Sequence, residues 1–180
     1  MKKLRNISLI GKLLLVMVVA RGFTSTCKAQ DVDYKAYTLF VYNFMKYIEW
    51  PEAQSKGDFV VGVYGDSPIL KELQMLASSK KLKGRTIVIK FLAKPEEAAG
   101  CQLLYVASSK SSVVKQLKEQ MKDKPILIVG EREGLAKKGA ALSFVTMDDD
   151  ALKFDINKKE IEQHQLKISS SLIALGTVVN

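Results

Sequence analysis

Residues able to carry out nucleophilic or metal chemistry are few in this chain. The 180 residues include one histidine, His164, and two cysteines, Cys27 and Cys101. A catalytic triad needs a histidine that is held by a carboxylate and faces a nucleophile. His164 lies in the polar stretch 160–167, where nothing marks it for that role, so we expect it on the surface. The acidic run 148–150 lacks the alternating ligands of a calcium loop. We therefore predict that the protein is not an enzyme and holds no metal.

Loops of the kind that bind cofactor phosphates do not match either. The dinucleotide fingerprint places G-x-G-x-x-G in the first strand–helix turn, whereas Gly62–Ser67 reads GVYGDS. The segment Gly130–Gly134 puts two acidic residues where a phosphate would bind, and the chain has no Walker A sequence. We therefore expect no cofactor.

Four polar residues follow predicted strands and are candidates for binding a small ligand. In open α/β sheets, ligands bind at the carboxyl ends of the strands. Asp66, Ser67, Ser108 and Glu131 fall at such ends, and their oxygens would hydrogen-bond a small polar ligand. Asp66 and Ser67 have an alternative role, since short polar residues also cap helices, and Pro68 suits a first helical position.

The first 29 residues have the features of a cleaved secretory signal peptide. Lys2, Lys3 and Arg5 precede the apolar run Leu13–Ala20, and small residues three and one before Gln30 suit a cut after Ala29. A cut after Ala20 is the alternative. The apolar run is far shorter than the ~20 residues of a membrane-spanning helix. We therefore predict that the protein is secreted through a cleaved signal peptide.

Removing this segment changes the charge of the chain. The full sequence has 28 basic and 19 acidic residues and a net charge of +9. Six of the basic residues lie in the first 29, so the rest of the chain has a net charge of +3. Such a surface gives no reason to expect nucleic acid as a partner.

The remaining residues, 30–180, alternate between strand and helix patterns and predict a single domain. A nearly continuous apolar run such as 125–130 is typical of a strand buried on both faces. Strand–helix–strand alternation implies right-handed crossovers. The predicted fold class is α/β, a three-layer, mostly parallel Rossmann-like sheet with helices on both faces and a C-terminal antiparallel β-hairpin at one edge. Predicted strands are 58–64, 85–92, 101–107, 125–130, 141–147 and 151–156, and predicted helices are 33–50, 68–76, 111–122 and 168–179.

The first predicted helix is apolar or aromatic around much of its circumference. It is therefore either buried on several sides within its own domain or shared with a partner, including a second copy in a homodimer. Cys101 has two interpretations as well. The apolar residues after it favour a small core residue, and the alternative is a redox-active thiol.

Several segments in order resemble the YfiR-like family of periplasmic proteins. They begin with Lys35-Ala36-Tyr37 and run through residues 42–51, 63–68, 83–85, 100–106, 126–130, 153–157 and 166–172. The resemblance implies a non-enzymatic regulator, and the best-known member type inhibits a membrane-bound diguanylate cyclase by binding its periplasmic sensor region. Other family domains occur beside sensor kinases. Two departures are the pair Gly139-Ala140, where members often have two glycines, and too few cysteines for the disulfides that some members use.

The resemblance suggests a partner-binding surface without fixing it by a motif. We predict that Tyr42, Tyr47, Glu49 and Trp50, at the end of the first helix, contact the extracytoplasmic part of a membrane signalling protein, a diguanylate cyclase or a sensor kinase. For Trp50 the alternative is structural, since with Pro51 it would plug the base of the sheet. The alternative function is a periplasmic small-ligand binding protein with a cleft at the strand carboxyl ends.

Overall fold

A computed structural model describes residues 32–147 and 151–180. Within it, Asp33–Asn180 form one compact unit. The predicted signal peptide 1–29 and the acidic run 148–150 lie outside the described residues.

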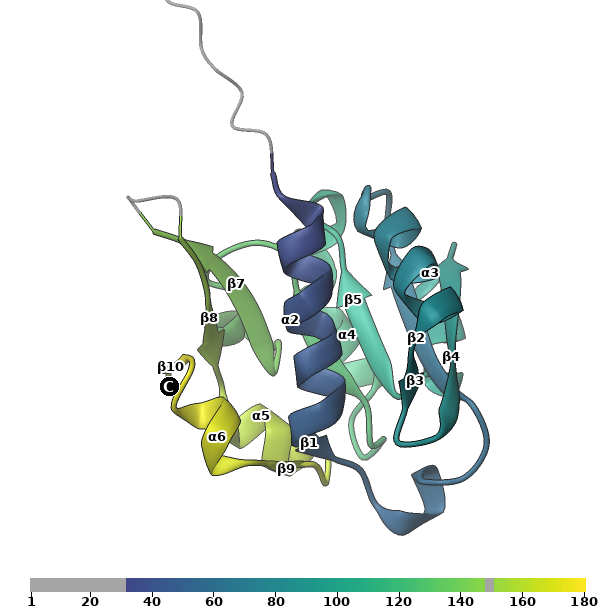
Figure 1. The fold of residues 1–180 in the computed structure, drawn as a ribbon. Helices are drawn as coiled ribbons and strands as arrows, with labels where there is room; N and C mark the ends of the chain where they lie inside the picture. Colours follow the sequence, from purple (N-terminus) through teal and green to yellow (C-terminus); the bar gives the residue numbers. More distant parts are fainter. Residues whose placement is uncertain (1–31, 148–150) are drawn as a thin grey trace, which may run out of the picture. The chain divides into compact units, whose positions relative to one another are not determined.

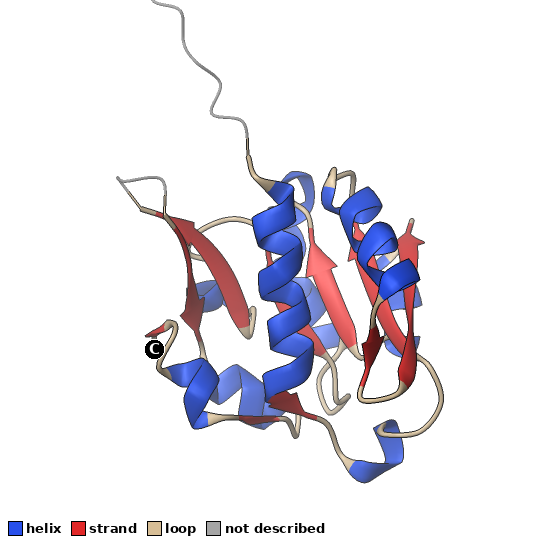
Figure 2. Cartoon of the chain, in the orientation of Figure 1, coloured by secondary structure: helices blue, strands red, loops and turns tan. Residues whose placement is uncertain are grey.

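The unit is built on an eight-stranded sheet in which five consecutive strands are parallel, which confirms the predicted Rossmann-like α/β class (Figures 1 and 2). The parallel strands lie in the order β4-β2-β5-β6-β7. Neighbouring β2 and β5 therefore send their chains to opposite sides, which is the switch point of a doubly wound sheet. The parallel strands are β2 (Phe59–Tyr64), β4 (Arg85–Leu92), β5 (Leu103–Val106), β6 (Leu127–Gly130) and β7 (Leu142–Thr146).

Three further strands complete the sheet at its edges, and two of them run antiparallel to the adjacent strand of the parallel set. The predicted C-terminal hairpin is confirmed as β7 paired antiparallel with β8 (Leu152–Ile156). It is not the outermost element, because β10 (Thr177–Val178) runs parallel along the outer side of β8. At the opposite edge, β3 (Lys81–Leu82) pairs with the beginning of β4.

Helices cover both faces, as predicted. Helices α2 (Tyr34–Tyr47) and α3 (Ile69–Ser79) pack on one face, and α4 (Val114–Gln120) packs on the other. Successive residues of each central strand point to opposite faces, so Leu103 and Tyr105 join the core beneath α2 and α3, while Leu104 and Val106 join the core beneath α4. This two-sided burial explains the continuous apolar runs.

Cys101 lies in the core beneath α4 and is 6% exposed, which confirms the core interpretation. Burial raises the pKa of its thiol. The neighbouring strand makes room for it with Gly62, where an added Cβ would lie 2.9 Å from the Cys101 sulfur.

The aromatic side chains of α2 pack against other residues of the same unit. Phe40 and Phe44 pack edge-on against Phe154, with ring centroids 5.6 and 4.9 Å apart, and Tyr37 stacks on Phe144 at 4.3 Å. Helix α2 therefore buries one aromatic face against the β7–β8 hairpin, as the first of the two interpretations expected.

Several predicted boundaries were wrong. The first helix ends at Tyr47 rather than Trp50, because Ile48–Glu49 forms β1, which pairs antiparallel with β9 (Lys167–Ile168). The predicted helix 111–122 is a 3-10 segment, η3 (Ser108–Val113), followed by α4.

The predicted C-terminal helix 168–179 was also wrong. Only α6 (Ser170–Ile173) is helical there, and the chain then extends into β10. The two ends of this segment are strands instead, because β9 pairs with β1 and β10 pairs with β8. The apolar Leu175 of this segment is 61% exposed.

A candidate docking groove and a buried polar cluster

The four predicted partner-binding residues lie near the amino ends of the parallel strands, and Trp50 is the best anchored of them. Its indole packs edge-on against Phe59, with ring centroids 4.9 Å apart at 87°. Its Nε1–H donates to the backbone oxygen of Gln102, 3.1 Å away. Trp50 therefore does close the base of the sheet, as its structural interpretation expected, but it remains half-buried rather than fully covered.

Gln102 holds the surroundings of Trp50 together. Its side-chain oxygen accepts from the backbone N–H of Val60 at 2.7 Å, and its side-chain amide donates to Gln54 Oε1 at 2.8 Å. Gln54 belongs to η1 (Glu52–Gln54), the 3-10 turn that follows Pro51. The loop after Trp50 is thus tied to β2 and β5 by one amide side chain.

Beside Trp50 lies a groove of about 340 Å³, which we call the Trp50 groove. Its apolar members Met45, Ile48, Phe59 and Leu82 are at most 4% exposed. Its lining residues are Met45, Ile48, Glu49, Trp50, Ser55, Phe59, Leu82, Lys83 and Arg85. An apolar floor with a charged rim is typical of a surface that receives a partner side chain.

Arg85 shapes one wall of the Trp50 groove. Its Nε donates to the backbone oxygen of Gly57 at 2.7 Å, and its Nη2 donates to that of Asp58 at 2.9 Å. Its guanidinium carbon lies 5.3 Å from the centre of the Phe59 ring. These contacts use the hydrogen-bonding capacity of Arg85 to hold the loop before β2, so the wall is fixed in place.

The structure brings two of the four predicted partner-binding residues into this groove. Glu49, which is exposed, and Trp50 line it. Tyr42 and Tyr47 lie outside its lining, on α2, with the ammonium of Lys46 5.9 Å from one ring centre and 5.5 Å from the other. The Tyr42 hydroxyl donates to the backbone oxygen of Lys81 at 3.0 Å, which ties α2 to β3.

At the other end of the sheet, Glu131 is the centre of a buried polar cluster. The carboxylate follows β6 and is 7% exposed. Its Oε1 accepts from the Tyr34 hydroxyl at 2.7 Å, and its Oε2 accepts from the backbone N–H of Ser108 at 2.9 Å. Burial, followed by the hydrogen bond to Glu131, raises the pKa of Tyr34 to about 12.

The four predicted ligand-binding residues are only partly brought together. Ser108 and Glu131 are joined by the hydrogen bond just described. Ser67 is half-buried, and its Oγ accepts from the N–H of Ile69 at 3.4 Å, but the N-cap of α3 is Pro68 rather than Asp66 or Ser67. Asp66 is exposed. Whether these residues bind a ligand stays a prediction.

Tyr34 was missed by the sequence reasoning, although it contacts Glu131 across 97 positions of chain. It is the first residue of α2, after the N-cap Asp33, whose carboxylate accepts from two backbone N–H groups. A tyrosine in the first turn of a helix carries no local signal of a distant carboxylate.

No metal centre or membrane span emerges from this geometry in the residues that the structure describes. No three of their histidine, cysteine and acidic side chains are grouped so that they would hold a metal ion. None of their helices has both the length and the apolar character to cross a bilayer.

Comparison with known proteins gives this architecture a family. The sequence profile of the family described as YfiR/HmsC-like matches residues 34–177, which is nearly all of the described unit. The chain belongs to the YfiR/HmsC-like family. Its members are periplasmic regulatory proteins, and the family is non-catalytic. No curated protein matches the chain.

One solved structure shares the fold of this family member at low identity, and a second gives a weaker match. A conserved domain protein from Vibrio cholerae O1 biovar eltor is similar with a TM-score of 0.58 and 11% identity, over 82% of this chain and 60% of that one. An ABC domain in complex with L-Trp from Streptococcus pneumoniae gives a TM-score of 0.47 and 14% identity, over 67% of this chain and 55% of that one. This chain therefore spans little more than half the length of either structure.

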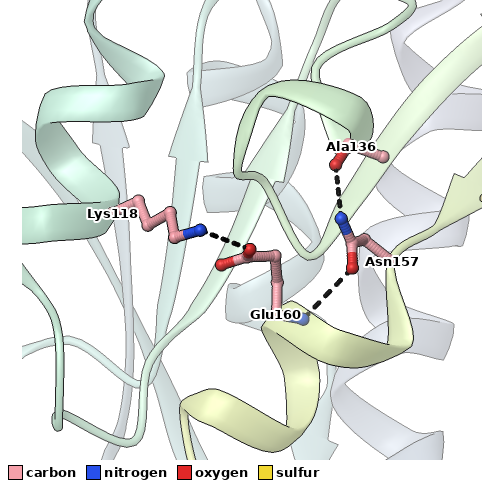
Figure 3. Close-up of polar contacts among 4 residues, drawn as sticks. All are labelled: Lys118, Ala136, Asn157 and Glu160. Carbon is pink, nitrogen blue, oxygen red and sulfur yellow. Dashed lines mark hydrogen bonds and ion pairs between the residues drawn. The ribbon is translucent and has the colours of Figure 1, made fainter. Parts of the chain in front are cut away.

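In this YfiR/HmsC-like chain, part of the sequence that carries the resemblance has a structural role (Figure 3). Asn157 caps α5 (Lys158–Gln163) by accepting from the N–H of Glu160 at 3.2 Å, and its amide donates to the backbone oxygen of Ala136 at 2.8 Å. Ser143 Oγ accepts from the N–H of the same Ala136 at 3.1 Å. The matching segment 153–157 thus holds the turn that contains Ala136 against the sheet.

The same region corrects the prediction for His164. It is 2% exposed rather than on the surface, and its Nδ1 lies 2.8 Å from the backbone oxygen of Lys124. One turn earlier, Glu160 pairs with Lys118, with Nζ and Oε1 2.6 Å apart (Figure 3). His164 is buried within a polar segment because α5 lies against α4.

Proposed function

We propose that this chain regulates a membrane signalling protein, a diguanylate cyclase or a sensor kinase, by binding its periplasmic part. Membership of a family of periplasmic regulators supports the regulatory class. The observation that carries the contact surface is the Trp50 groove, which combines a buried apolar floor with a half-exposed indole and is lined by two of the predicted residues.

The composition of the Trp50 groove indicates what its occupant contributes. Its floor suits one apolar side chain of the partner, because buried apolar anchors carry most of the energy of an interface. The charged lining residues are Glu49, Lys83 and Arg85. Charges of both signs at the rim orient the partner and affect the rate of association more than the affinity.

A matched pair of substitutions tests the groove without removing any of its anchors. Ser55 is exposed and lines the groove, so Ser55→Trp places an indole where the partner side chain would lie. Ser112 is exposed on η3, beyond the carboxyl end of β5, so Ser112→Trp makes the same change at the opposite end of the sheet. The protein without residues 1–29 is immobilised and used to capture detergent-solubilised envelope membrane proteins.

We expect the wild type and Ser112→Trp to capture one membrane protein that carries a cyclase or kinase domain. Ser55→Trp should capture it at least about tenfold less, which corresponds to about 1.4 kcal/mol of binding free energy. Equal capture by Ser55→Trp and the wild type would exclude the groove. Recovery of no cyclase or kinase by any form would exclude the proposed partner class.

A second candidate function, small-ligand binding at the strand carboxyl ends, is favoured by the switch point between β2 and β5. Asp66 and Ser67 follow β2, and Ser108 follows β5, with the Glu131 carboxylate beneath. A ligand there either binds at exposed Asp66 or displaces Tyr34 from Glu131.

Thermal unfolding with fractions of a metabolite extract tests this second function, since a ligand at 100 times its Kd adds about 2.7 kcal/mol to the free energy of unfolding. A stabilisation lost in Asp66→Asn, but kept in the control Asp58→Asn at the other end of β2, would support it, and no stabilisation by any fraction would refute it.

A further inference from the structure

One edge of the main sheet is open along most of a long strand. Strand β3 pairs only with Arg85 and Thr86 of β4, and no described strand pairs with Ile87–Leu92 on that side. Figure 1 shows short β3 beside the lower part of β4, and the strand order ends with β3 at this edge. An unpaired strand edge is a row of free backbone donors and acceptors that another strand can pair with.

The pairing pattern identifies which backbone groups face this edge. Lys83 and Gly84, both with positive φ, form the two-residue turn between Leu82 and Arg85, so the backbone of Arg85 faces β3. Backbone direction in a strand repeats every two residues. The pair Lys81–Thr86 still belongs to the ladder with β3, so the N–H and C=O groups beyond it that face the open edge are those of Ile89 and Phe91, while Val88, Lys90 and Leu92 face β2.

The side chains of this edge leave it accessible. Phe91 is 50% exposed, and Val88 and Ile89 are half-buried. The stretch contains no proline and one charged residue, Lys90. The open part ends at Ala93, whose N–H is bound by Glu97 Oε2 at 3.0 Å. The accessible length suits an added strand of about six residues.

Charge selects the kind of strand. Residues 80–94 contain six basic and no acidic residues. In an antiparallel pair formed by two copies of β4, these basic residues would face one another and repel, and like charges across strands are destabilising. An acidic strand would be attracted by the same charges.

We propose that the open edge of β4 binds an extended acidic segment of another protein by strand addition. This surface goes beyond the Trp50 groove, because Ile87–Leu92 is not part of the groove lining. Main-chain hydrogen bonds from Ile89 and Phe91 hold the segment, and Lys90 pairs with its acidic side chains.

Two synthetic peptides test the proposal directly. One alternates glutamate and valine over seven residues, and the other has lysine in place of every glutamate. Amide hydrogen exchange of the protein without residues 1–29 is followed by NMR. Before peptide is added, the amides of Ile89 and Phe91 should exchange faster than those of Val88, Lys90 and Leu92. The acidic peptide should slow the first set, with an effect that weakens at high salt, and the basic peptide should not.

Two variants of one residue separate backbone from side-chain contact. Phe91→Pro removes an N–H that faces the open edge and leaves the ladder to β2 intact, since proline is tolerated on edge strands. Phe91→Ala removes the ring and keeps the N–H. We expect Phe91→Pro to bind the acidic peptide roughly three- to tenfold more weakly than Phe91→Ala. Should Phe91→Pro fail to fold, Lys90→Glu should reverse the preference between the two peptides.

Four results would overturn the proposal. They are no added protection with the acidic peptide, equal binding of both peptides by the wild type, and equal affinity of Phe91→Pro and Phe91→Ala. The fourth is wild-type dimerisation through β4 that Phe91→Pro abolishes, which would assign the edge to a second copy of the chain. None of these results depends on the Trp50 groove, so the proposed function is tested separately.

Discussion

The two ends of the parallel sheet use their polar groups in different ways. At the carboxyl ends of the strands, Glu131 is buried and both of its carboxylate oxygens accept hydrogen bonds, from Tyr34 and from the backbone of Ser108. At the amino ends, Trp50 and Gln102 also bond to each other, but a groove of about 340 Å³ lies beside the indole.

The difference teaches that a polar residue at a strand end is not by itself a binding group. Ligands of α/β sheets are expected at the carboxyl ends, yet Glu131 there is engaged in joining α2 to η3 and β6. At the amino ends, the hydrogen bonds of Gln102 and Arg85 hold backbone in place around an apolar floor. One end therefore contributes to stability, and the other has the shape of a docking surface.

Removal of the Glu131 carboxylate should give the largest effect on stability. Glu131→Ala leaves the Tyr34 hydroxyl and the Ser108 N–H without their shared acceptor. Two charge-assisted hydrogen bonds are lost, so the free energy of unfolding should fall by about 3 kcal/mol. Urea unfolding measures it, with exposed Glu133→Ala as the control that should change stability by no more than about 0.5 kcal/mol. Similar stability of the two variants would show that the carboxyl end is not closed by this cluster.

Tyr34→Phe should have a smaller effect that depends on pH. Below pH 10 the phenol is protonated in both folded and unfolded chains, and loss of its bond to Glu131 should cost about 1.5 kcal/mol. Because folding raises the pKa of Tyr34 to about 12, the unfolded chain releases this proton first as pH rises. The wild type should therefore lose its advantage over Tyr34→Phe between about pH 10 and pH 12.

Chemical denaturation of both proteins at a series of pH values measures this difference. Burial also raises the pKa values of Tyr37 and Tyr105, and this largest cause of their shifts is common to both proteins. A constant difference across that pH range would mean that Tyr34 does not share its proton with Glu131 in the folded protein.

Trp50→Phe should have the smallest effect of the three. The substitution keeps an aromatic ring against Phe59 and removes the N–H that bonds to Gln102, at a cost of about 1 kcal/mol in the free energy of unfolding. Thermal unfolding and capture of the membrane partner are measured on the same preparation. Capture by Trp50→Phe that matches the wild type would indicate that the ring, rather than the indole N–H, serves the groove.

The sequence predicted the central sheet well because each strand carries a strong apolar run. Residues 125–130 and 101–107 were identified as strands, and they are buried on both faces as β6 and β5. Prediction was poor where an element is short and pairs with a segment far away in the sequence. Ile48–Glu49 continues a helical pattern in the sequence, and only its pairing with Lys167–Ile168 makes it a strand.

The candidate sites were predicted in part for the same reason. The sequence placed four polar residues at strand carboxyl ends because they follow predicted strands in the chain. They do lie there, and they are Asp66, Ser67, Ser108 and Glu131. That Glu131 is paired with Tyr34 did not follow, because nothing local relates residues 97 positions apart. The burial of His164 was missed for the same reason, since its partner Lys124 lies 40 positions away.

By itself the sequence determined the α/β class, the burial of a central strand on both faces and the likeness to a family of regulators, because periodicity and apolar runs act over a few residues. Tertiary structure alone decided that Glu131 is engaged, that Trp50 borders a groove and that β4 keeps an open edge. These features depend on which distant elements meet and in what register, and that is settled only when the core packs.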